Sequence, residues 1–216
     1  MNTSHTIEYK IEGSEMQSVE IILDPQETVI GEAGALFYME QPIEMKTMFG
    51  DGTAQDGLMG KILGAGKRLL TGESLFMTSF THTGTGQARV AFASPYPGKI
   101  IPFDLQKYGN KIICQKDAFL CAAQGSQIGI AFQKKLGTIF FGGEGFIMQK
   151  IEGDGLVFVH AGGHIIEKNL AAGESLRVDT GCVVAYTKDI NFDIEFVRDI
   201  KTALFGGEGI NFAKIF

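Results

Sequence analysis

Short apolar runs separated by glycine-rich turns follow one another along most of the chain. Many runs alternate apolar and polar residues, which is the pattern of a half-buried β-strand. Turns such as Gly84-Thr85-Gly86 and Gly153-Asp154-Gly155 suit hairpins, because glycine readily adopts positive φ. We therefore predict an all-β protein. Its clearest strands are expected at Ile7–Ile11, Val19–Leu23, Ala35–Met39, Ser74–Phe80, Arg89–Phe92, Ile128–Phe132, Phe146–Ile151 and Leu156–Val159.

One pattern of residues occurs three times along the chain. Each copy begins with a short strand, continues to an Ile-Ile pair, reaches a glycine before an apolar run, and closes with a Gly-Glu turn. The pairs are Ile21-Ile22, Ile100-Ile101 and Ile165-Ile166; the glycines are Gly34, Gly125 and Gly181; the turns contain Glu73, Glu144 and Glu208. The order of these features is the same in all three copies.

The repeats predict three tandem β-modules with pseudo-threefold symmetry. Their boundaries are 7–86, which includes an insertion at 46–70, then 87–155 and 156–216. Each module is near or below the size at which an isolated core is stable. Because each would leave sheet edges exposed, we expect the modules to pack side by side and to close into a ring with other chains.

The insertion contains the one segment in which a helical period prevails, near 56–70. Its leucines, Met59 and Ile62 fall within an arc of about 140°, opposite Lys61, Lys67 and Arg68. Three internal glycines weaken the helix by about 1 kcal/mol each relative to alanine. Two interpretations remain open: the segment docks on an anionic membrane or a partner groove, or it packs against its own ring.

The Gly-Glu turns also allow two interpretations. They lack the Lys and Ser/Thr of a phosphate-binding loop, and a strand follows each of them. Glu73, Glu144 and Glu208 either accept hydrogen bonds from turn amides or form a rim of carboxylates available to cations or a basic partner.

Composition narrows the classes of protein further. The 216 residues are 44% apolar and 20% charged, which excludes a disordered chain, and the net charge of -6 argues against a dedicated nucleic-acid binder. The N-terminus shows no basic segment followed by a long apolar one, and no apolar stretch approaches the roughly 20 residues of a membrane span. The odd set Cys114, Cys121 and Cys182 lies in apolar runs, as expected for buried, reduced thiols. We expect a soluble cytoplasmic protein.

The sequence Asp179-Thr180-Gly181 is similar to the aspartic-protease signature, whose chemistry requires two carboxylates that share one proton. The corresponding positions of the other copies, Glu32-Ala33-Gly34 and Ala123-Gln124-Gly125, offer no partner aspartate. A protease would therefore require a homodimer, and the alternative is a turn that leads into a strand.

His160 and His164 have the spacing of a helical metal pair, but Ala161-Gly162-Gly163 between them predicts extended chain. On a strand this spacing separates the two rings by about 13 Å, too far to share one zinc ion. We expect no metal, no cofactor and no enzymatic activity.

Three stretches of the repeats carry a resemblance to a known family. They are Leu69-Leu70-Thr71-Gly72-Glu73-Ser74-Leu75-Phe76, Phe141-Gly142-Gly143-Glu144-Gly145 and Val178-Asp179-Thr180-Gly181-Cys182-Val183-Val184-Ala185. In this order they resemble the AIM (altered inheritance of mitochondria) family of bacterial and mitochondrial proteins. The resemblance implies three short double-stranded β-helix modules, similar to the tryptophan RNA-binding attenuation protein, with three chains forming a nine-module ring. It implies no catalytic residues, and it associates the mitochondrial members with inner-membrane organisation.

We therefore expect a non-enzymatic scaffold, or a ring that binds a ligand or partner, assembled as a homotrimer. Its partners are other copies of the chain and an unidentified protein or small molecule. Two alternatives are an RNA-binding ring, by fold analogy, and an organiser at a membrane surface that acts through the basic insertion. The acidic balance of charge argues against nucleic acid.

Overall fold

The computed structural model describes residues 4–32, 34–49, 76–134, 146–196 and 211–216. These residues form β-strands connected by turns and by three short 3-10 helices, η1 (Leu105–Tyr108), η2 (Lys116–Ala118) and η3 (Thr180–Cys182). The prediction of an all-β protein is confirmed. No helix in these ranges is long and apolar enough to cross a membrane. The segment 56–70 lies outside the described residues, whereas residues 46–49 of the expected insertion belong to a strand.

Four antiparallel sheets make up the fold, and we name them A to D. In sheet A the strand order is β1-β2-β7-β4. Its members are β1 (Glu8–Glu12), β2 (Ser18–Leu23), β7 (Ala88–Ala93) and β4 (Leu36–Met39).

Sheet B is the largest, with the order β5-β6-β3-β10-β13-β8. Its members are β5 (Ile43–Phe49), β6 (Phe76–His82), β3 (Thr28–Glu32), β10 (Phe119–Ala123), β13 (Leu156–Gly162) and β8 (Gly98–Asp104).

Sheets C and D contain the remaining described strands. The order is β11-β12-β9-β15 in sheet C and β14-β17-β16 in sheet D. Their members are β11 (Gln127–Lys134), β12 (Phe146–Glu152), β9 (Lys111–Gln115), β15 (Ala185–Thr187), β14 (Leu176–Asp179), β17 (Asn211–Ile215) and β16 (Phe192–Phe196).

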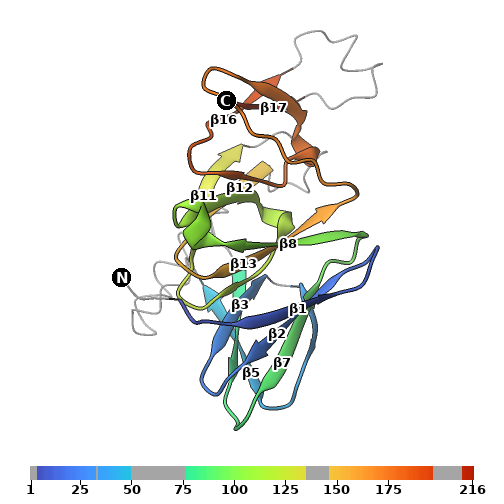
Figure 1. The fold of residues 1–216 in the computed structure, drawn as a ribbon, viewed down its shortest axis with the longest axis vertical. Coiled ribbons are helices and arrows are strands. Elements are labelled where there is room, and N and C mark those ends of the chain that lie inside the picture. Colours follow the sequence, from blue (N-terminus) through green and yellow to red (C-terminus); the bar gives the residue numbers. More distant parts are fainter. Residues whose placement is uncertain (1–3, 33, 50–75, 135–145, 197–210) are drawn as a thin grey trace.

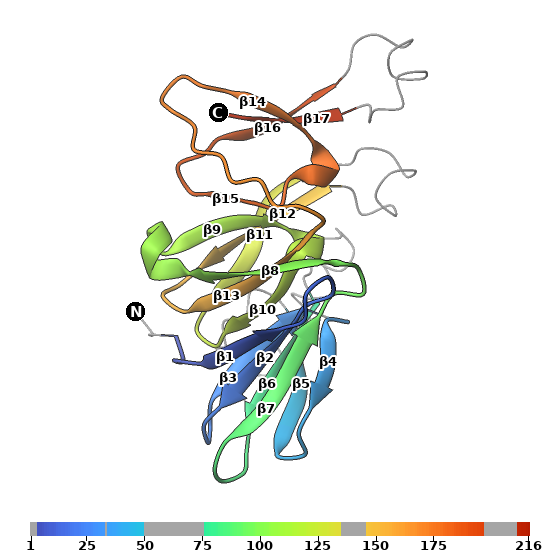
Figure 2. The same cartoon turned by 45° about the vertical axis from the view of Figure 1, so that its right-hand side comes forward.

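Sheet D lies at one end of the long axis of the molecule, and sheet A lies at the other end beside β3, β5 and β6 of sheet B (Figures 1 and 2). Three apolar cores lie between the sheets. The first joins sheets A and B through residues such as Phe92 and Phe80, whose rings meet edge to face at 5.2 Å. The second joins sheets B and C, and the third joins sheets C and D. Each inner sheet therefore has a core on both faces.

The side-chain period of two explains why the inner strands read as continuous apolar runs. In β9, Ile112 belongs to the second core and the next residue, Ile113, belongs to the third. In β3, Val29 and Ile30 are divided in the same way between the first and second cores. A strand that is buried on both faces thus needs apolar residues at successive positions.

The predicted strands are all present among the described residues, and their ends there differ by at most three residues. Ser74 and Leu75 of the predicted strand Ser74–Phe80 lie outside the described residues. The prediction that the glycine turns form hairpins is wrong. Gly84-Thr85-Gly86 connects β6 in sheet B to β7 in sheet A, and Gly153-Asp154-Gly155 connects β12 in sheet C to β13 in sheet B. Turn chemistry sets the local reversal of the chain, but it does not decide whether the two flanking strands pair with each other.

Candidate functional site

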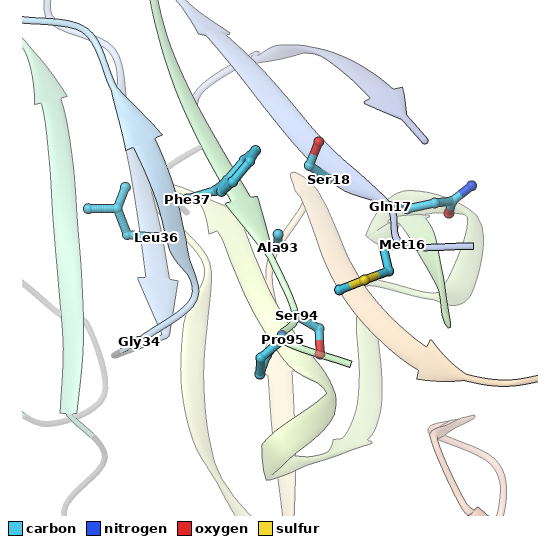
Figure 3. Close-up of a pocket in the computed structure, with 9 residues that line it drawn as sticks. All are labelled: Met16, Gln17, Ser18, Gly34, Leu36, Phe37, Ala93, Ser94 and Pro95. Carbon is cyan, nitrogen blue, oxygen red and sulfur yellow. The ribbon is translucent and has the colours of Figure 1, made fainter. Parts of the chain in front are cut away.

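An apolar hollow lies at the end of sheet A, beside the outer strand β4. Three segments line it: residues 16–18, which lead into β2; residues 34, 36 and 37, at the start of β4; and residues 93–95, which leave β7 (Figure 3). Its volume is about 360 Å³, within the range of sites that hold small ligands.

The backbone fixes the three segments relative to one another. Ser18 lies opposite Ala93 in the β2–β7 ladder, and the Ala93 amide donates a hydrogen bond of 2.9 Å to the carbonyl of Ala35. The β4–β7 register shifts between Leu36 and Tyr38, which leaves Phe37 as an extra residue at a bulge. The Phe37 side chain is 64% exposed, so its ring is available at the mouth of the hollow.

The side chains that line the hollow are uncharged. The carboxamide of Gln17 is already engaged, because its oxygen accepts from the Ile100 amide at 2.7 Å and its nitrogen donates to the Gly13 carbonyl at 3.3 Å. The Ser94 hydroxyl accepts from the Tyr96 amide at 3.3 Å. This arrangement suits an uncharged apolar group, and its lining supplies no pair of groups for acid-base chemistry.

His160 lies behind the turn that follows the hollow. An added Cβ at Gly98 would lie only 2.5 Å from His160 Nε2, so the ring packs directly on this turn. Burial lowers the pKa of His160, while a hydrogen bond to the Tyr96 backbone opposes the shift. His164 follows the end of β13, after Gly163 at φ +68°. Within the described ranges no group of three or more His, Cys, Asp or Glu residues could hold a metal ion.

Asp179 has a structural role in the turn before β15. Its carboxylate accepts a hydrogen bond of 2.8 Å from the Gly181 amide at the start of η3. The interpretation of Asp179-Thr180-Gly181 as a turn that leads into a strand is confirmed.

Two of the three cysteines are buried as expected. Burial raises the pKa of the Cys114 thiol to about 12, with a smaller contribution from the charge of Glu32, and burial also raises the pKa of Cys121. Both thiols are therefore protonated at neutral pH and unreactive. The prediction for Cys182 is wrong: it ends η3 and is exposed, because the apolar run there starts with a turn.

The residues predicted for partner or membrane contact all lie outside the described residues. Lys61, Lys67, Arg68 and Glu73 fall in 50–75, Glu144 in 135–145 and Glu208 in 197–210. The rim of carboxylates and the basic face therefore stay predictions.

The hollow itself was not predicted from the sequence. The run from Leu36 to Met39 is as apolar as the buried run from Phe119 to Ala123, so hydrophobicity alone makes both look like core strands. The informative feature is exposure: all four residues of β4 are exposed, and all five of β10 are buried.

The fold and the hollow define an all-β chain of stacked antiparallel sheets with an exposed apolar edge. The model of the family described as mitochondrial biogenesis AIM24 matches residues 9–215, so the chain belongs to this family. This confirms the resemblance seen in the sequence.

Two relatives from Streptococcus pyogenes are similar to the chain. An uncharacterised protein of serotype M6 is 29% identical over 196 residues, which cover 89% of this chain and 75% of the relative. A crystal structure of a protein from the same species superposes with a TM-score of 0.72 at 22% identity, covering 96% of this chain and 88% of the other. At this identity the structural similarity establishes the fold alone.

Proposed function

We propose that the chain is a non-enzymatic scaffold or partner-binding protein whose working unit is a ring of three chains. Each chain contributes three related β-modules, and binding takes place at the junctions between modules.

The order of strands supports the modules. The boundaries 7–86, 87–155 and 156–216 enclose β1–β6, β7–β12 and β13–β17. The third module has no strand between β13 and β14, so β13 takes the first position of the module pattern and β14–β17 take the third to sixth positions. In two sheets the strand at the third position of one module pairs with the strand at the fourth position of the next, as β3 with β10 and β9 with β15. The registers of the two pairings agree as well. Gly31 of β3 lies opposite Cys121 of β10, and Cys114, at the same position of β9, lies opposite Ala185 of β15. Since sheets B and C are built across module boundaries, no module completes them alone.

These registers revise one detail of the sequence repeat. Gly34 lies three residues after Gly31 of β3. Gly181 lies three residues after Val178, which occupies the same position in β14. The same count from Cys114 in β9 leads to Asp117 rather than Gly125. Sequence comparison selected Gly125 because it is a glycine before an apolar run.

The exposure of β4 is the observation that carries the proposal. Leu36, Phe37, Tyr38 and Met39 are 37%, 64%, 41% and 40% exposed. No strand among the described residues pairs with the outer edge of β4, whereas β10, at the same place in its module, has a strand on each side and is buried. An unpaired apolar edge strand invites another chain.

When one surface of a chain contacts a different surface of the next copy, the contact is head-to-tail. Repeated head-to-tail contacts form a closed ring when the rotation from each copy to the next returns to the first copy. Closure at three chains follows the nine-module ring that the family resemblance implies. In such a ring the hollow beside β4 would lie at the junction between two chains, where an apolar ligand or side chain of a partner would contact both.

The mass of the particle in solution tests the assembly. Light scattering at micromolar concentration is expected to give three times the chain mass of 23.4 kDa. The variant Phe37→Glu is expected to run as a single chain. It places a charge at a position of β4 whose counterpart in β10, Leu120, is buried.

Met45→Glu is the matched control. Met45 is an exposed apolar residue on β5. This strand is the edge strand of sheet B, just as β11 and β16 are edge strands of sheets C and D. This variant is expected to keep the mass of the wild type. A single-chain mass for the wild-type protein would contradict the proposal.

A further inference from the structure

Sheets A and D correspond to the two halves of sheet B. The first half of sheet B, β5-β6-β3, has the same module positions as β16-β17-β14, which make up sheet D. The second half, β10-β13-β8, has the same positions as β4-β7-β2 of sheet A. We infer that sheet D of one chain and sheet A of a second copy join into one continuous sheet through antiparallel pairing of β14 with the partner's β4. This inference rests on the proposed ring and specifies its contact.

The two junctions inside the chain determine the register of this pairing. Gly31 lies opposite Cys121 at the first junction, and Cys114 lies opposite Ala185 at the second. In β6, β12 and β17, the partners of Gly31, Cys114 and Val178 are Thr78, Gln149 and Ala213. Val178 therefore occupies in the third module the position that Gly31 occupies in the first and Cys114 in the second. Likewise, Tyr38 occupies in the first module the position that Cys121 occupies in the second and Ala185 in the third. The register pairs Val178 with the partner's Tyr38.

A shared bulge supports the placement of Tyr38. The β4–β7 ladder shifts between Leu36 and Tyr38, and the β10–β13 ladder shifts between Phe119 and Cys121. The irregularity occurs at the same step in both strands. Tyr38 therefore corresponds to Cys121 in structure as well as in sequence order.

The phase of the hydrogen bonds agrees at the two internal junctions. The Gln124 amide donates to the Thr28 carbonyl at 3.1 Å, and the Gln115 amide donates to the Val184 carbonyl at 2.9 Å. Because hydrogen-bonded and non-hydrogen-bonded pairs alternate, Gly31–Cys121 and Cys114–Ala185 are both non-hydrogen-bonded pairs. Val178 and the partner's Tyr38 would be a pair of the same kind, with their Cα atoms about 4.5 Å apart.

The faces of the strands agree in the same way. A Cβ on Gly31 would meet Phe92 and Phe80 of the first core, to which Cys121 also belongs. Cys114 belongs to the second core, and Ala185 packs against it. Val178 packs against the third core, so the partner's Tyr38 would cover the edge of that core.

A second copy of the chain is the occupant that this pattern specifies. Register, hydrogen-bond phase and facing core are each repeated at the two internal junctions. At the third junction, β14 would take the place of β3 and β9, and the partner's β4 would take the place of β10 and β15. In one molecule β14 and β4 lie at opposite ends (Figure 2). An unrelated strand would satisfy the open edge, but it would not be required to reproduce this register.

A disulfide cross-link tests the register. The double variant Tyr38→Cys with Val178→Cys is made in a Cys182→Ala background, which removes the one exposed native thiol of the described residues. Mild oxidation of the purified full chain is expected to give covalent dimers and trimers on a non-reducing gel, with the trimer as the largest species. Tyr38→Cys with Arg177→Cys is the control, because adjacent strand residues point to opposite faces. We expect it to link at least about tenfold more slowly, since its Cβ atoms lie outside disulfide geometry.

The outcomes separate this inference from the proposed function. A trimeric mass without cross-linking, or equal linking of the control pair, would overturn the β14–β4 register while leaving the ring intact. A single-chain mass would overturn both. If Tyr38→Cys prevents folding, the pair Glu40→Cys with Leu176→Cys replaces it, because Ala123 with Val29 and Thr187 with Ile112 are the matching internal pairs. Linking of that pair supports the register, and its failure in a folded trimer contradicts it.

Discussion

At the scale of single residues, Gly31 shows how closely sheets A and B approach. A Cβ at this position would lie 2.5 Å from Phe92 Cε1 and 3.0 Å from Phe80 Cε2. Both rings are almost completely buried and pack against each other, so neither has free space into which it can move. A glycine is required here by close packing rather than by backbone conformation.

Gly31→Ala is therefore expected to destabilise the protein by about 1–3 kcal/mol, the usual cost of overpacking a core. Urea unfolding followed by circular dichroism measures the change. The control is Gly162→Ala, where the nearest atom to an added Cβ is the Pro97 carbonyl oxygen at 3.8 Å. If both variants are as stable as the wild type, the packing of Phe92 over β3 is not as described.

At the scale of elements, charged pairs connect neighbouring strands on the surface of sheet C. Glu152 in β12 lies opposite Lys111 in β9. Its carboxylate forms ion pairs of 3.1 Å with Lys111 and with Lys150. Burial opposes ionisation of Glu152, but its hydrogen bonds to the two lysines prevail and lower its pKa below the ordinary 4.5. A depressed folded-state pKa stabilises the fold above the unfolded pKa, and this stabilisation is lost as the pH falls through the folded value.

Glu152→Gln is thus expected to lower the free energy of unfolding at pH 7 by less than about 1 kcal/mol, because solvent screens these partly exposed groups. The difference from the wild type should narrow as the pH falls below 4.5. Chemical unfolding at several pH values measures it. Glu44→Gln is the control, because Glu44 pairs with Lys46 on its own strand and is mostly exposed. A difference that stays constant down to pH 3 would show that the carboxylate does not contribute through its charge.

The elements differ in how well the sequence predicted them. Strands such as β2 and β12 were found because apolar positions recur within short runs bounded by turns. Their pairing was not predictable in the same way. The turns at Gly84-Thr85-Gly86 and Gly153-Asp154-Gly155 join strands of different sheets, because a turn fixes the direction of the chain and not its hydrogen-bond partner.

The candidate site was predictable only in part. The sequence predicted that the modules pack side by side and close into a ring with other chains, since small β-modules leave open edges. It did not locate the hollow at Phe37, because an apolar strand at the end of a sheet has the same composition as one in the middle. Burial depends on which strand lies alongside, and that strand can come from distant sequence or from another chain.

At the scale of the whole molecule, the four sheets form a series that is open at both ends. Sheet A ends in β4 and sheet D ends in β14, with no described strand on the outer side of either. The internal junctions β3–β10 and β9–β15 show how such ends pair. A ring of chains would therefore cover the exposed apolar surface of β4.

Hydrogen exchange of the Met39 amide tests most directly whether β4 is covered. The Glu40 amide donates to the Arg89 carbonyl at 2.9 Å, within the β4–β7 ladder. Because hydrogen-bonded pairs alternate along a ladder, the Met39 amide points away from β7, towards the open edge. We expect this amide to be protected from exchange in the wild-type protein, and we expect Phe37→Glu to abolish the protection. Exchange at the rate of an unstructured peptide in the wild-type protein would contradict this expectation.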